Sequence, residues 1–568
     1  MNIFNIQSQE EIEETFRNTT NEISIGYDKQ KALILNIGTK LLNYIGSKID
    51  PKDVATLATA IGISLLKNNS VQQLGAIIGA RTSGVLTGKS MATGIDILKG
   101  LGGVLTIEDD NTVHATKKHS STATVTRRIS NLVPEIPMVS VPLDWTNNRD
   151  GGYYTQKSSI FLGRHTVPHN DVNYSAINKL QKVEFELDEE MMNKLPTFNK
   201  YRKFEKLYAQ RSFYFTWKYD KRGRSYSVGY PLNIQADEQS KALISFAKQE
   251  IIQDYNSLFI SIAGYAGLSN LTWQERIDWV RNNLSNLDSI EWKKPILAKK
   301  AINAFEATME NESTGYWMEL DATSSGIQIM ALLSGCYDSA DLTNCIDPTV
   351  RKNLHSIICD KMNDSLPKHK VDLKTVKGAV MTHYYNSELA PKRVFNEEQL
   401  LVFESVLSGL LPGVEDVMGA INDCWDDGAT EHSWTLPDGH RVIVPVITPV
   451  DYLYDDGVLN VPYRVYENIP SNLKWRSLCP NVIHSIDGYI AREMVRRCNF
   501  DLVHIHDCFC FHPNYLDEVR DTYKEIMAEI ASSDLLADIV FEITGVIAPS
   551  IKRRNLAKEV LMSEYMLS

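Results

Sequence analysis

The hydrophobic and polar positions divide the chain into regions of different pattern. Near the N-terminus apolar side chains recur at helical spacing, which predicts acidic amphipathic helices over residues 10–17, 29–48 and 51–67. From about residue 205 onward, short apolar runs that end in Asp or Gly alternate with helical patterns, which is typical of mixed helix and sheet layers. The stretch 105–150, rich in Thr, Ser and Val, is expected to be extended chain or linker. We therefore predict a domain boundary near residue 200.

The composition, 43% hydrophobic and 23% charged residues, is that of a folded globular protein and excludes disordered and collagen-like chains. A chain of 568 residues is too long for one hydrophobic core, so we expect two or three sub-domains. Eight cysteines, none before Cys336, predict reduced thiols and a cytoplasmic location. The sequence has no targeting pattern and no apolar run of roughly 20 residues, so no membrane partner is expected. A net charge of −12 argues against general attraction to nucleic acid but is compatible with a local basic channel.

Two motifs resemble known ligand sites but differ from them in spacing. Residues 84–90 have three residues between the two glycines, whereas a phosphate-binding loop needs four, so we interpret them as a surface turn. A second set alternates along one predicted strand, a spacing at which zinc ligands rarely converge on one tetrahedron: His504, His506, Cys508, Cys510 and His512. Neither motif is predicted to bind a ligand.

Two carboxylates far apart in the sequence each belong to a short apolar strand. Asp321 ends the run 316–321 and precedes a turn that opens a helix, and Asp507 lies in a predicted hairpin over 502–511. Two carboxylates on separate strands can hold two Mg²⁺ ions through their oxygens and support phosphoryl transfer. Either aspartate alone is more often a turn cap, so the hypothesis depends on the pair.

A predicted helix over 374–386 carries a cation, an apolar group and an aromatic group on one face. Lys377, Met381 and Tyr385 recur every fourth residue, and Lys374 lies one turn earlier. Such a face could bind a nucleoside triphosphate, with Lys at the phosphates and Tyr near base and sugar. An ordinary amphipathic helix would have a similar pattern.

The segment 219–226 is a glycine turn flanked by basic residues, among them Arg222 and Arg224, followed by Tyr226. It could bind a nucleic-acid backbone, or it could be a solvated hairpin. The pattern alone favours the hairpin.

Taken together and in this order, five segments resemble the bacteriophage- and mitochondrial-type single-subunit DNA-directed RNA polymerases. Tyr219–Tyr226 is similar to the family's D-x-R-G-R-x-Y element, Asp321–Gln328 to D-x-S-x-S-G-I-Q, and Lys377–Tyr385 to K-x-S-V-M-T-x-x-Y. Pro480–Gly488 is similar to P-N-x-x-H-S-x-D-G, and His506–Phe509 to H-D-S-F. The likeness extends over about residues 140–568, and the order of the five motifs makes it more specific than any one of them.

The resemblance implies a role for each matching residue. Asp321, Asp507 and the backbone carbonyl of Ala322 would bind two Mg²⁺ ions. Lys377, with Lys374 and Met381 on the same helix, would contact the incoming nucleotide. Tyr385 and His484 would sense the ribose, and both would count with Asp321, Asp507 and Lys377 as catalytic. The nucleic acid would be bound by Arg222, Arg224 and Tyr226.

The resemblance also implies an α+β, right-hand polymerase fold. Its parts would be an antiparallel palm, helical fingers and a reduced thumb, behind a mainly helical N-terminal region. The expected divisions are a reduced N-terminal domain over 1–140, a connector with the reduced thumb over 141–210, the first part of the palm over 211–345, the fingers with a hairpin at 442–466 over 346–480, and the second part of the palm over 481–568.

Several positions depart from the family's pattern. Leu373 stands where the family has Arg, four residues before the helix Lys, and Asn386 and Cys510 replace glycines. These departures concern triphosphate binding and translocation rather than metal chemistry. Only about 30 residues separate Gln181 from Gln210, where the family has a long helical thumb.

We therefore expect a DNA-directed RNA polymerase that copies a DNA template into RNA from ribonucleoside triphosphates. With a reduced N-terminal domain it is expected to need an accessory DNA-binding protein on duplex DNA. Its location would be the cytoplasm, that of the host cell if a phage encodes it. A family-A-like DNA polymerase or a priming polymerase would share the aspartates and the Lys–Tyr helix. A catalytically silent nucleic-acid-binding subunit is the alternative from another class, and binding alone would not need paired carboxylates.

Overall fold

The structure is a computed structural model, and the residues that it describes form two compact units. The small unit comprises residues 10–134 and 446–471, and the large unit comprises 1–9, 135–445 and 472–568. None of the described helices is long and apolar enough to cross a membrane. The described residues are 9–13, 33–44, 51–65, 70–84, 86–116, 135–155, 157–163, 165–197, 199, 201–229, 232–366, 368–387, 389–473, 475–547 and 550–568.

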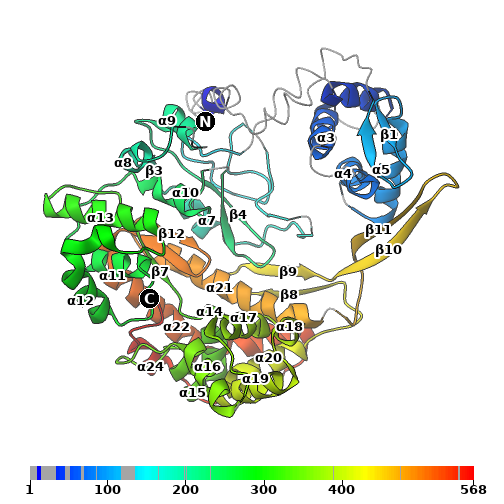
Figure 1. Cartoon of the computed structure of the whole chain (residues 1–568). Helices are drawn as coiled ribbons and strands as arrows, with labels where there is room; N and C mark the ends of the chain where they lie inside the picture. The colour runs from blue at the N-terminus through cyan, green and yellow to red at the C-terminus, as the bar shows by residue number, and fades with distance from the viewer. Residues whose placement is uncertain are drawn as a thin grey trace. The chain divides into compact units, whose positions relative to one another are not determined.

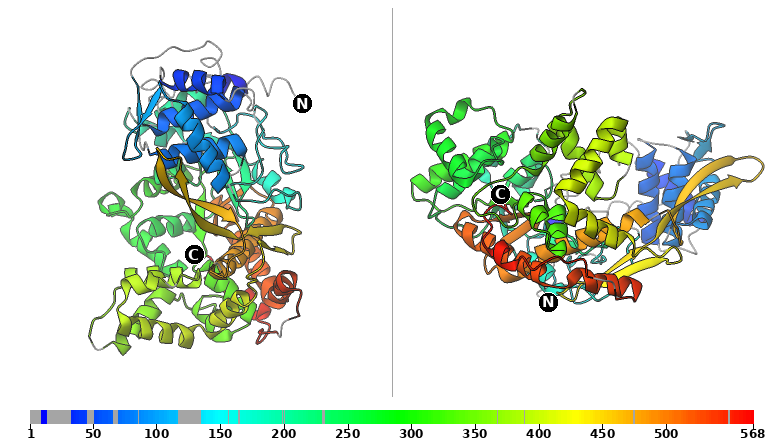
Figure 2. Two further views of the ribbon diagram at one scale, coloured as in Figure 1. Left: turned by 90° about the vertical axis from the view of Figure 1, so that its right-hand side faces the viewer. Right: turned by 90° about the horizontal axis from the view of Figure 1, so that it is seen from below.

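The small unit packs helices against a long hairpin. Its core contains apolar residues of the helices together with Val461, Tyr463 and Val465 of that hairpin. Both views in Figure 2 show the hairpin beside the N-terminal helices. The elements are α3 (Pro51–Ser64), α4 (Val71–Ser83), α5 (Gly88–Gly100), β1 (Leu105–Ile107), β2 (Val113–Ala115), β10 (Ile447–Asp455) and β11 (Asn460–Asn468).

The structure differs from the sequence-based expectation at this hairpin. Its strands span 447–455 and 460–468 rather than 442–466, and it groups with the N-terminal helices rather than with residues 346–480. The physical reason is that one face of β11 is apolar and is buried by helices far away in the sequence, which no local pattern reveals. Part of the predicted linker 105–150 is the short hairpin β1–β2. Parts of the predicted helices 10–17 and 29–48 lie outside the described residues.

Within the segment 84–90, helix α5 begins at Gly88. Thr87 caps α5 in a reciprocal capping box with Ser90. The backbone N–H of Gly88 donates to Glu467 Oε1 at 2.6 Å, and a Cβ on Gly88 would lie 2.3 Å from the Tyr452 ring. A carboxylate of the hairpin thus occupies this helix N-terminus, which agrees with the rejection of the motif.

The large unit has a three-stranded antiparallel sheet at its centre, in the order β12-β13-β7. The strands are β7 (Met318–Asp321), β12 (Leu502–Ile505) and β13 (Cys508–Phe511). Helices α14 (Ser325–Ser334), α21 (Leu478–Arg497) and α22 (Leu516–Ser532) pack against one another, and α21 also contacts β12 (Figure 1). Strands and helices thus form a mixed α+β unit, which confirms the predicted class.

An aromatic cluster fixes the chain on the approach to β7. The ring of Phe185 lies 5.3–6.2 Å from the rings of Phe213, Phe215, Phe246 and Trp317. Such offset and edge-to-face pairs add specific geometry to the burial of apolar area. Because Trp317 directly precedes β7, this packing sets the position of the strand.

The remaining elements of the large unit surround the sheet or form two-stranded pairs, β3–β6, β4–β5 and β8–β9. In its first half they are α7 (Tyr174–Leu180), β3 (Phe185–Leu187), α8 (Glu189–Asn193), α9 (Arg202–Tyr208), β4 (Thr216–Tyr219), β5 (Ser225–Val228), α10 (Glu238–Ala242), β6 (Ile244–Phe246), α11 (Asn256–Tyr265), α12 (Trp273–Asn283), η1 (Leu284–Ser289) and α13 (Pro295–Met309). They continue with α15 (Tyr337–Leu342), α16 (Leu354–Ser365), α17 (Leu373–Tyr384), α18 (Leu389–Val394), α19 (Glu397–Leu410), α20 (Pro412–Asn422), β8 (Glu431–Thr435), β9 (Arg441–Pro445), η2 (Trp475–Ser477), η3 (Pro513–Tyr515), α23 (Leu535–Thr544) and α24 (Ala557–Leu561).

Candidate active site

The central sheet brings the two predicted carboxylates to one edge. Asp321 is the last residue of β7, and Asp507 lies in the turn between β12 and β13. Cys508 pairs with Asp321 across the sheet, and the N–H of Ala322 donates to the carbonyl of Asp507 at 3.2 Å. His506 has a φ of 59°, in the left-handed region, which makes the turn tight. Both side chains line one cavity of about 630 Å³.

The surroundings of the two aspartates in this cavity disfavour their ionised forms. Burial raises the pKa of Asp321, and the neighbouring Glu319 adds to the effect. Burial also raises the pKa of Asp507, and the carboxylates of Asp487 and Asp321 raise it further. In the described part of the chain no Lys or Arg forms an ion pair with either aspartate, so their mutual repulsion favours a bound cation.

The donor set fits Mg²⁺ bound together with a substrate. Across the described residues no cluster of three or more His, Cys, Asp or Glu side chains is arranged to hold a metal. Asp321 and Asp507 offer carboxylate oxygens, and Mg²⁺ is usually bound by one or two carboxylates with water and substrate phosphates completing its shell. Glu319 faces the same side of β7 but is neutralised by Lys241 at 2.9 Å.

Helix α17 places one of its predicted cations in the cavity and the other outside it. Lys377 lines the cavity and is exposed, whereas Lys374 is exposed without lining it. Met381 is half-buried on the same helix. Burial and the charge of Lys377 lower the pKa of His355 to about 4, so this neighbouring imidazole is neutral at pH 7. The helix ends at Tyr384, which leaves Tyr385 as its C-cap rather than within the predicted helix 374–386.

Tyr385 and His484, which the family resemblance assigns to one pair, lie together. Their ring centroids are 4.7 Å apart. Arg222 Nη1 lies 2.6 Å from His484 Nδ1, and because a guanidinium can only donate, Nδ1 is the acceptor and Nε2 carries the proton. Burial, then Arg224 and Arg222, lower the pKa of His484 to about 2, which keeps the imidazole neutral.

The basic residues of the turn 219–226 bind groups of the protein itself. Arg222 pairs with Asp220 at 2.6 Å in addition to His484. Arg224 pairs with Asp487 at 2.7 Å. The Tyr226 hydroxyl donates to Asp220 at 3.3 Å. Arg222 and Arg224 thus link the turn to α21, whereas the sequence-based hypothesis assigned all three side chains to a nucleic-acid backbone.

Asp487 is a residue of the site that sequence reasoning missed. It is only 4% exposed and accepts hydrogen bonds from Ser325 Oγ at 2.5 Å and Arg224 Nε at 2.9 Å. It therefore joins three of the five motifs, those at 219–226, 321–328 and 480–488. The signal was its place within the last motif, but a buried carboxylate cannot be distinguished from an exposed one by a motif alone.

Of the alternating His and Cys residues of 504–512, His504 uses both ring nitrogens within the protein. His504 is buried, and its Nε2 lies 2.9 Å from Ser225 Oγ. Its Nδ1 lies 3.0 Å from the carbonyl oxygen of His506. All eight cysteines of the chain are unpaired.

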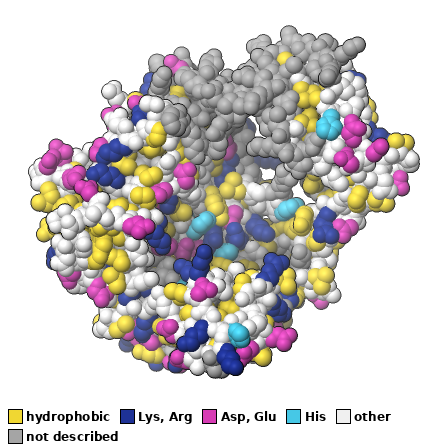
Figure 3. All heavy atoms as spheres, viewed as in Figure 1, with side chains coloured by type: hydrophobic (Ala, Val, Ile, Leu, Met, Phe, Trp, Pro, Cys, Tyr) yellow, Lys and Arg dark blue, Asp and Glu magenta, His cyan; other side chains and the backbone are white. Residues whose placement is uncertain are grey.

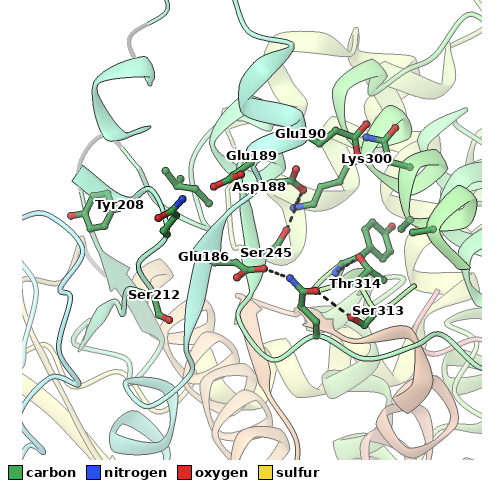
Figure 4. A pocket seen from close by; sticks show the side chains of 18 of the residues that line it. Glu186, Asp188, Glu189, Glu190, Tyr208, Ser212, Ser245, Lys300, Ser313 and Thr314 are labelled. Atoms are coloured by element: carbon green, nitrogen blue, oxygen red, sulfur yellow. Dashed lines mark hydrogen bonds and ion pairs between the residues drawn. The ribbon is translucent and has the colours of Figure 1, made fainter. Parts of the chain in front are cut away.

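A second cavity of about 520 Å³ lies apart from these residues and is lined by acidic groups (Figure 4). Asp188 lies 3.6 Å from the buried Lys300, and Gln249 Nε2 donates to Glu186 at 2.6 Å. Glu189 and Glu190 extend its negative lining. Its charge does not suit phosphate groups. On the face of the large unit seen in Figure 3, Lys and Arg side chains instead gather around a hollow near the centre.

Comparison with known proteins agrees with the motifs. Residues 433–565, which contain His484, Asp487 and Asp507, match the family model described as DNA-dependent RNA polymerase. The chain is 23% identical over 510 residues to a probable DNA-directed RNA polymerase of Gelasinospora sp. (strain G114), covering 71% of this chain and 61% of that protein. It is also 23% identical over 387 residues to a probable DNA-directed RNA polymerase of Neurospora crassa, covering 54% of this chain and 42% of the relative.

A probable DNA-directed RNA polymerase of Podospora anserina is 27% identical over 190 residues, which is 30% of this chain and 18% of that protein. The chain thus spans about half the length of the curated relatives that it matches. The resemblance drawn from the five motifs is confirmed.

Proposed function

Starting from this similarity to the DNA-dependent RNA polymerases, we propose that the chain is a DNA-directed RNA polymerase that transfers nucleotides from ribonucleoside triphosphates to RNA. The observation that carries the proposal is the meeting of Asp321 and Asp507 at one sheet edge, in a cavity that Lys377 also lines. A cavity with paired carboxylates and a free cation suits a nucleotide bound with divalent metal.

The metal sites in this proposal are Asp321, Asp507 and the backbone carbonyl of Ala322. Bound there, two Mg²⁺ ions would lower the pKa of the RNA 3′-hydroxyl and neutralise charge on the reacting phosphate and leaving group. With metal bound, the two aspartates would supply the negative charge of the site, and the hydrogen bond from the N–H of Ala322 to the carbonyl of Asp507 fixes their spacing. Lys377 neutralises the triphosphate and stabilises the leaving pyrophosphate.

His484 and Tyr385 recognise the sugar. The protonated Nε2 of His484 is a donor that can reach a ribose 2′-hydroxyl, since Arg222 occupies Nδ1. The pair is positioned by Arg222, which bonds His484 Nδ1, and by the neighbouring Arg224 and Asp487, which bond each other. The same donor would be left without a partner by a deoxyribonucleotide, which disfavours DNA synthesis.

We propose the right-hand arrangement for the large unit. The sheet β12-β13-β7 would be the palm, formed by 211–345 and 481–568, and α16 to α20 would belong to fingers over 346–480. A reduced thumb in 141–210 is supported by the short helices α8 and α9. The 1–140 region would be a reduced N-terminal domain, and the hairpin β10–β11 would act with it.

The proposed partners are a DNA template, the nascent RNA and an accessory DNA-binding protein. The reduced thumb is also compatible with the alternative function of a priming polymerase, because little structure would hold a long RNA product. A cytoplasmic location, in a phage host if a phage encodes the chain, is proposed from the unpaired cysteines.

The test is incubation of the purified chain with single-stranded DNA, Mg²⁺ and labelled ribo- or deoxyribonucleotides without primer. Labelled RNA would support the proposal, and product length would separate transcription from priming. Labelled DNA would instead indicate a family-A-like DNA polymerase. No product would favour a silent nucleic-acid-binding subunit.

A further inference from the structure

The cavity that holds Asp321 and Asp507 has a cationic wall beyond the residues assigned above. Arg276, Arg351 and Lys352 line it together with Lys377. Arg351 and Lys352 come from the segment just before α16, and Arg276 comes from α12. Lys241, Lys293 and Lys294 also line this cavity, so several chain segments bring positive charge to it.

The charge of Lys352 is already compensated, whereas that of Arg351 is not. Lys352 pairs with Asp341 and, at 3.1 Å, with Asp347. Among the described residues Arg351 has no acidic partner; its Nη1 donates to the carbonyl of Lys352 at 2.5 Å. Its Nε is buried without a hydrogen-bond partner within the described structure. An uncompensated guanidinium in a partly desolvated cavity is costly, unless an anion from outside the chain binds it.

Arg276 makes the surroundings of Arg351 still more positive. It is 2% exposed and is held by carbonyl oxygens of Leu271 and Ser269, with no carboxylate bound to it in the described part of the chain. Burial, and next the charge of Arg351, lower the pKa of Arg276 to about 10. Arg276 is buried, and its Nε and Nη2 already donate to Leu271, Ser269 and Ser568, so Arg351 is the arginine better placed for a ligand.

Helix α17 offers only one cation to this cavity. One helical turn before Lys377 the residue that lines the cavity is Leu373, an apolar side chain. Any further cation at this cavity belongs to another element. Arg351 suits a phosphate group better than a lysine would, because its planar fork can donate to two oxygens at once.

We propose that Arg351 binds the β- and γ-phosphates of the incoming nucleoside triphosphate, and the pyrophosphate that leaves, from the wall of the cavity that Lys377 also lines. This inference rests on the proposed polymerase function. It assigns to the segment before α16 a role in substrate binding that none of the five motifs contains.

The experiment measures phosphate binding separately from catalysis, with the full chain as wild type, Arg351→Ala, Arg351→Lys and the control Arg393→Ala. Arg393 is an exposed arginine of α18 that lines neither described cavity. Isothermal titration calorimetry gives the affinity for inorganic tripolyphosphate with Mg²⁺. Steady-state transcription on single-stranded DNA gives KM and kcat for ribonucleotides, and fluorescence anisotropy gives DNA affinity.

For Arg351→Ala we expect about 10- to 100-fold weaker tripolyphosphate binding and a similar rise in nucleotide KM, the scale of one charge-assisted contact. Inhibition by pyrophosphate should weaken in parallel, while kcat changes less and DNA affinity stays the same. Arg351→Lys should recover part of the loss because it keeps the charge, and Arg393→Ala should match wild type.

Two results would overturn the inference. Unchanged tripolyphosphate affinity and KM in Arg351→Ala would show that Arg351 contacts no triphosphate, even if the wild type makes RNA. Weakened DNA binding with unchanged tripolyphosphate affinity would assign Arg351 to the polynucleotide instead. If the wild-type chain makes no RNA but binds tripolyphosphate more tightly than Arg351→Ala does, the polymerase proposal fails while the phosphate site stands.

Discussion

His484 illustrates how neighbouring groups decide the chemistry of one side chain. An exposed histidine titrates near pH 6.5, but burial and two arginines lower the pKa of His484 to about 2. The bond from Arg222 also selects the tautomer with the proton on Nε2. The residue is thus a fixed hydrogen-bond donor over the whole physiological pH range.

Replacing either carboxylate of the pair should abolish synthesis without unfolding the chain. For Asp321→Asn and Asp507→Asn we expect at least about 10³-fold lower turnover, because charge stabilisation of a phosphoryl transition state is lost. Burial raises the pKa of both aspartates, and nearby carboxylates, Glu319 for Asp321 and Asp487 for Asp507, raise it further, so both groups cost folding free energy in the metal-free protein at neutral pH. Each metal-free variant should therefore melt at the wild-type temperature or slightly above it.

Differential scanning calorimetry with and without Mg²⁺ measures the melting temperatures of the wild type and the two aspartate variants. Mg²⁺ should raise the Tm of the wild type, as any ligand of the folded state does, and raise that of the variants less. Near-normal turnover of either variant at ordinary Mg²⁺ concentration would contradict the assignment of the pair.

Tyr385→Phe should relax sugar discrimination with little loss of rate on ribonucleotides. The Tyr385 ring lies against His484, and removing its hydroxyl alters the polar surface that a sugar meets. An unpaired polar group costs about 1–3 kcal/mol, so we expect the ribo-to-deoxyribonucleotide incorporation ratio to fall by about 5- to 150-fold. The measurement is that ratio under single-nucleotide competition, and an equal ratio in both proteins would remove Tyr385 from sugar recognition.

At the scale of elements, helix α21 and the turn 219–226 must approach closely. A Cβ on Gly488 would lie 2.8 Å from the carbonyl oxygen of Gly223 and 3.1 Å from the backbone N of Arg224. Only a glycine permits this distance, which lets Asp487, one residue earlier, reach Arg224. Gly488 thus allows α21 to pack closely against the turn, and this packing places Asp487 within reach of Arg224.

Gly488→Ala should therefore destabilise the large unit and lower activity together. The contact atoms are backbone and cannot rotate away, so we expect a loss of about 1–3 kcal/mol and a lower Tm. The matched control is Gly409→Ala within α19, where a Cβ would meet nothing within 4 Å. That change should stabilise the helix by about 1 kcal/mol. Equal thermal stability of the two variants would refute the close-packing argument.

At the scale of the molecule, the hairpin β10–β11 offers little positive charge to DNA. Arg464 is bound by Asp451 through two hydrogen bonds, at 2.6 and 2.9 Å. Near the tip Lys99 pairs with Asp456, and Asp455 adds negative charge. The inner face of the hairpin is used in the core of the small unit. Such a surface attracts phosphates weakly.

The isolated chain should therefore copy single-stranded or pre-melted DNA and transcribe closed duplex poorly. Opening a duplex costs about 1.4 kcal/mol per base-pair step, which contacts to DNA must offset. We expect transcript yield to rise from duplex to mismatched-bubble to single-stranded templates of the same sequence. An added single-strand-binding protein should raise the yield on duplex. Equal, promoter-specific yield from closed duplex would show that the chain needs no accessory protein.

The sequence by itself determined the local parts of this protein. Asp321 at a strand end, the hairpin around Asp507 and the mixed α+β class all follow from apolar runs that stop at polar residues. The spacing of residues 84–90 was enough to reject a phosphate loop, because that loop requires a fixed number of residues. These features depend on neighbours within about ten positions, which a single sequence displays.

Only the tertiary structure decided which distant groups meet. Arg222 and Arg224 look like phosphate ligands in the sequence, yet they bind Asp220, His484 and Asp487. Arg351 has no motif, and the role proposed for it follows from its place in the cavity wall without an ion pair to any acidic side chain of the described residues. The hairpin packs against the N-terminal helices because removing its apolar face from water is favourable. Which surface covers that face depends on the folded chain and not on the local sequence.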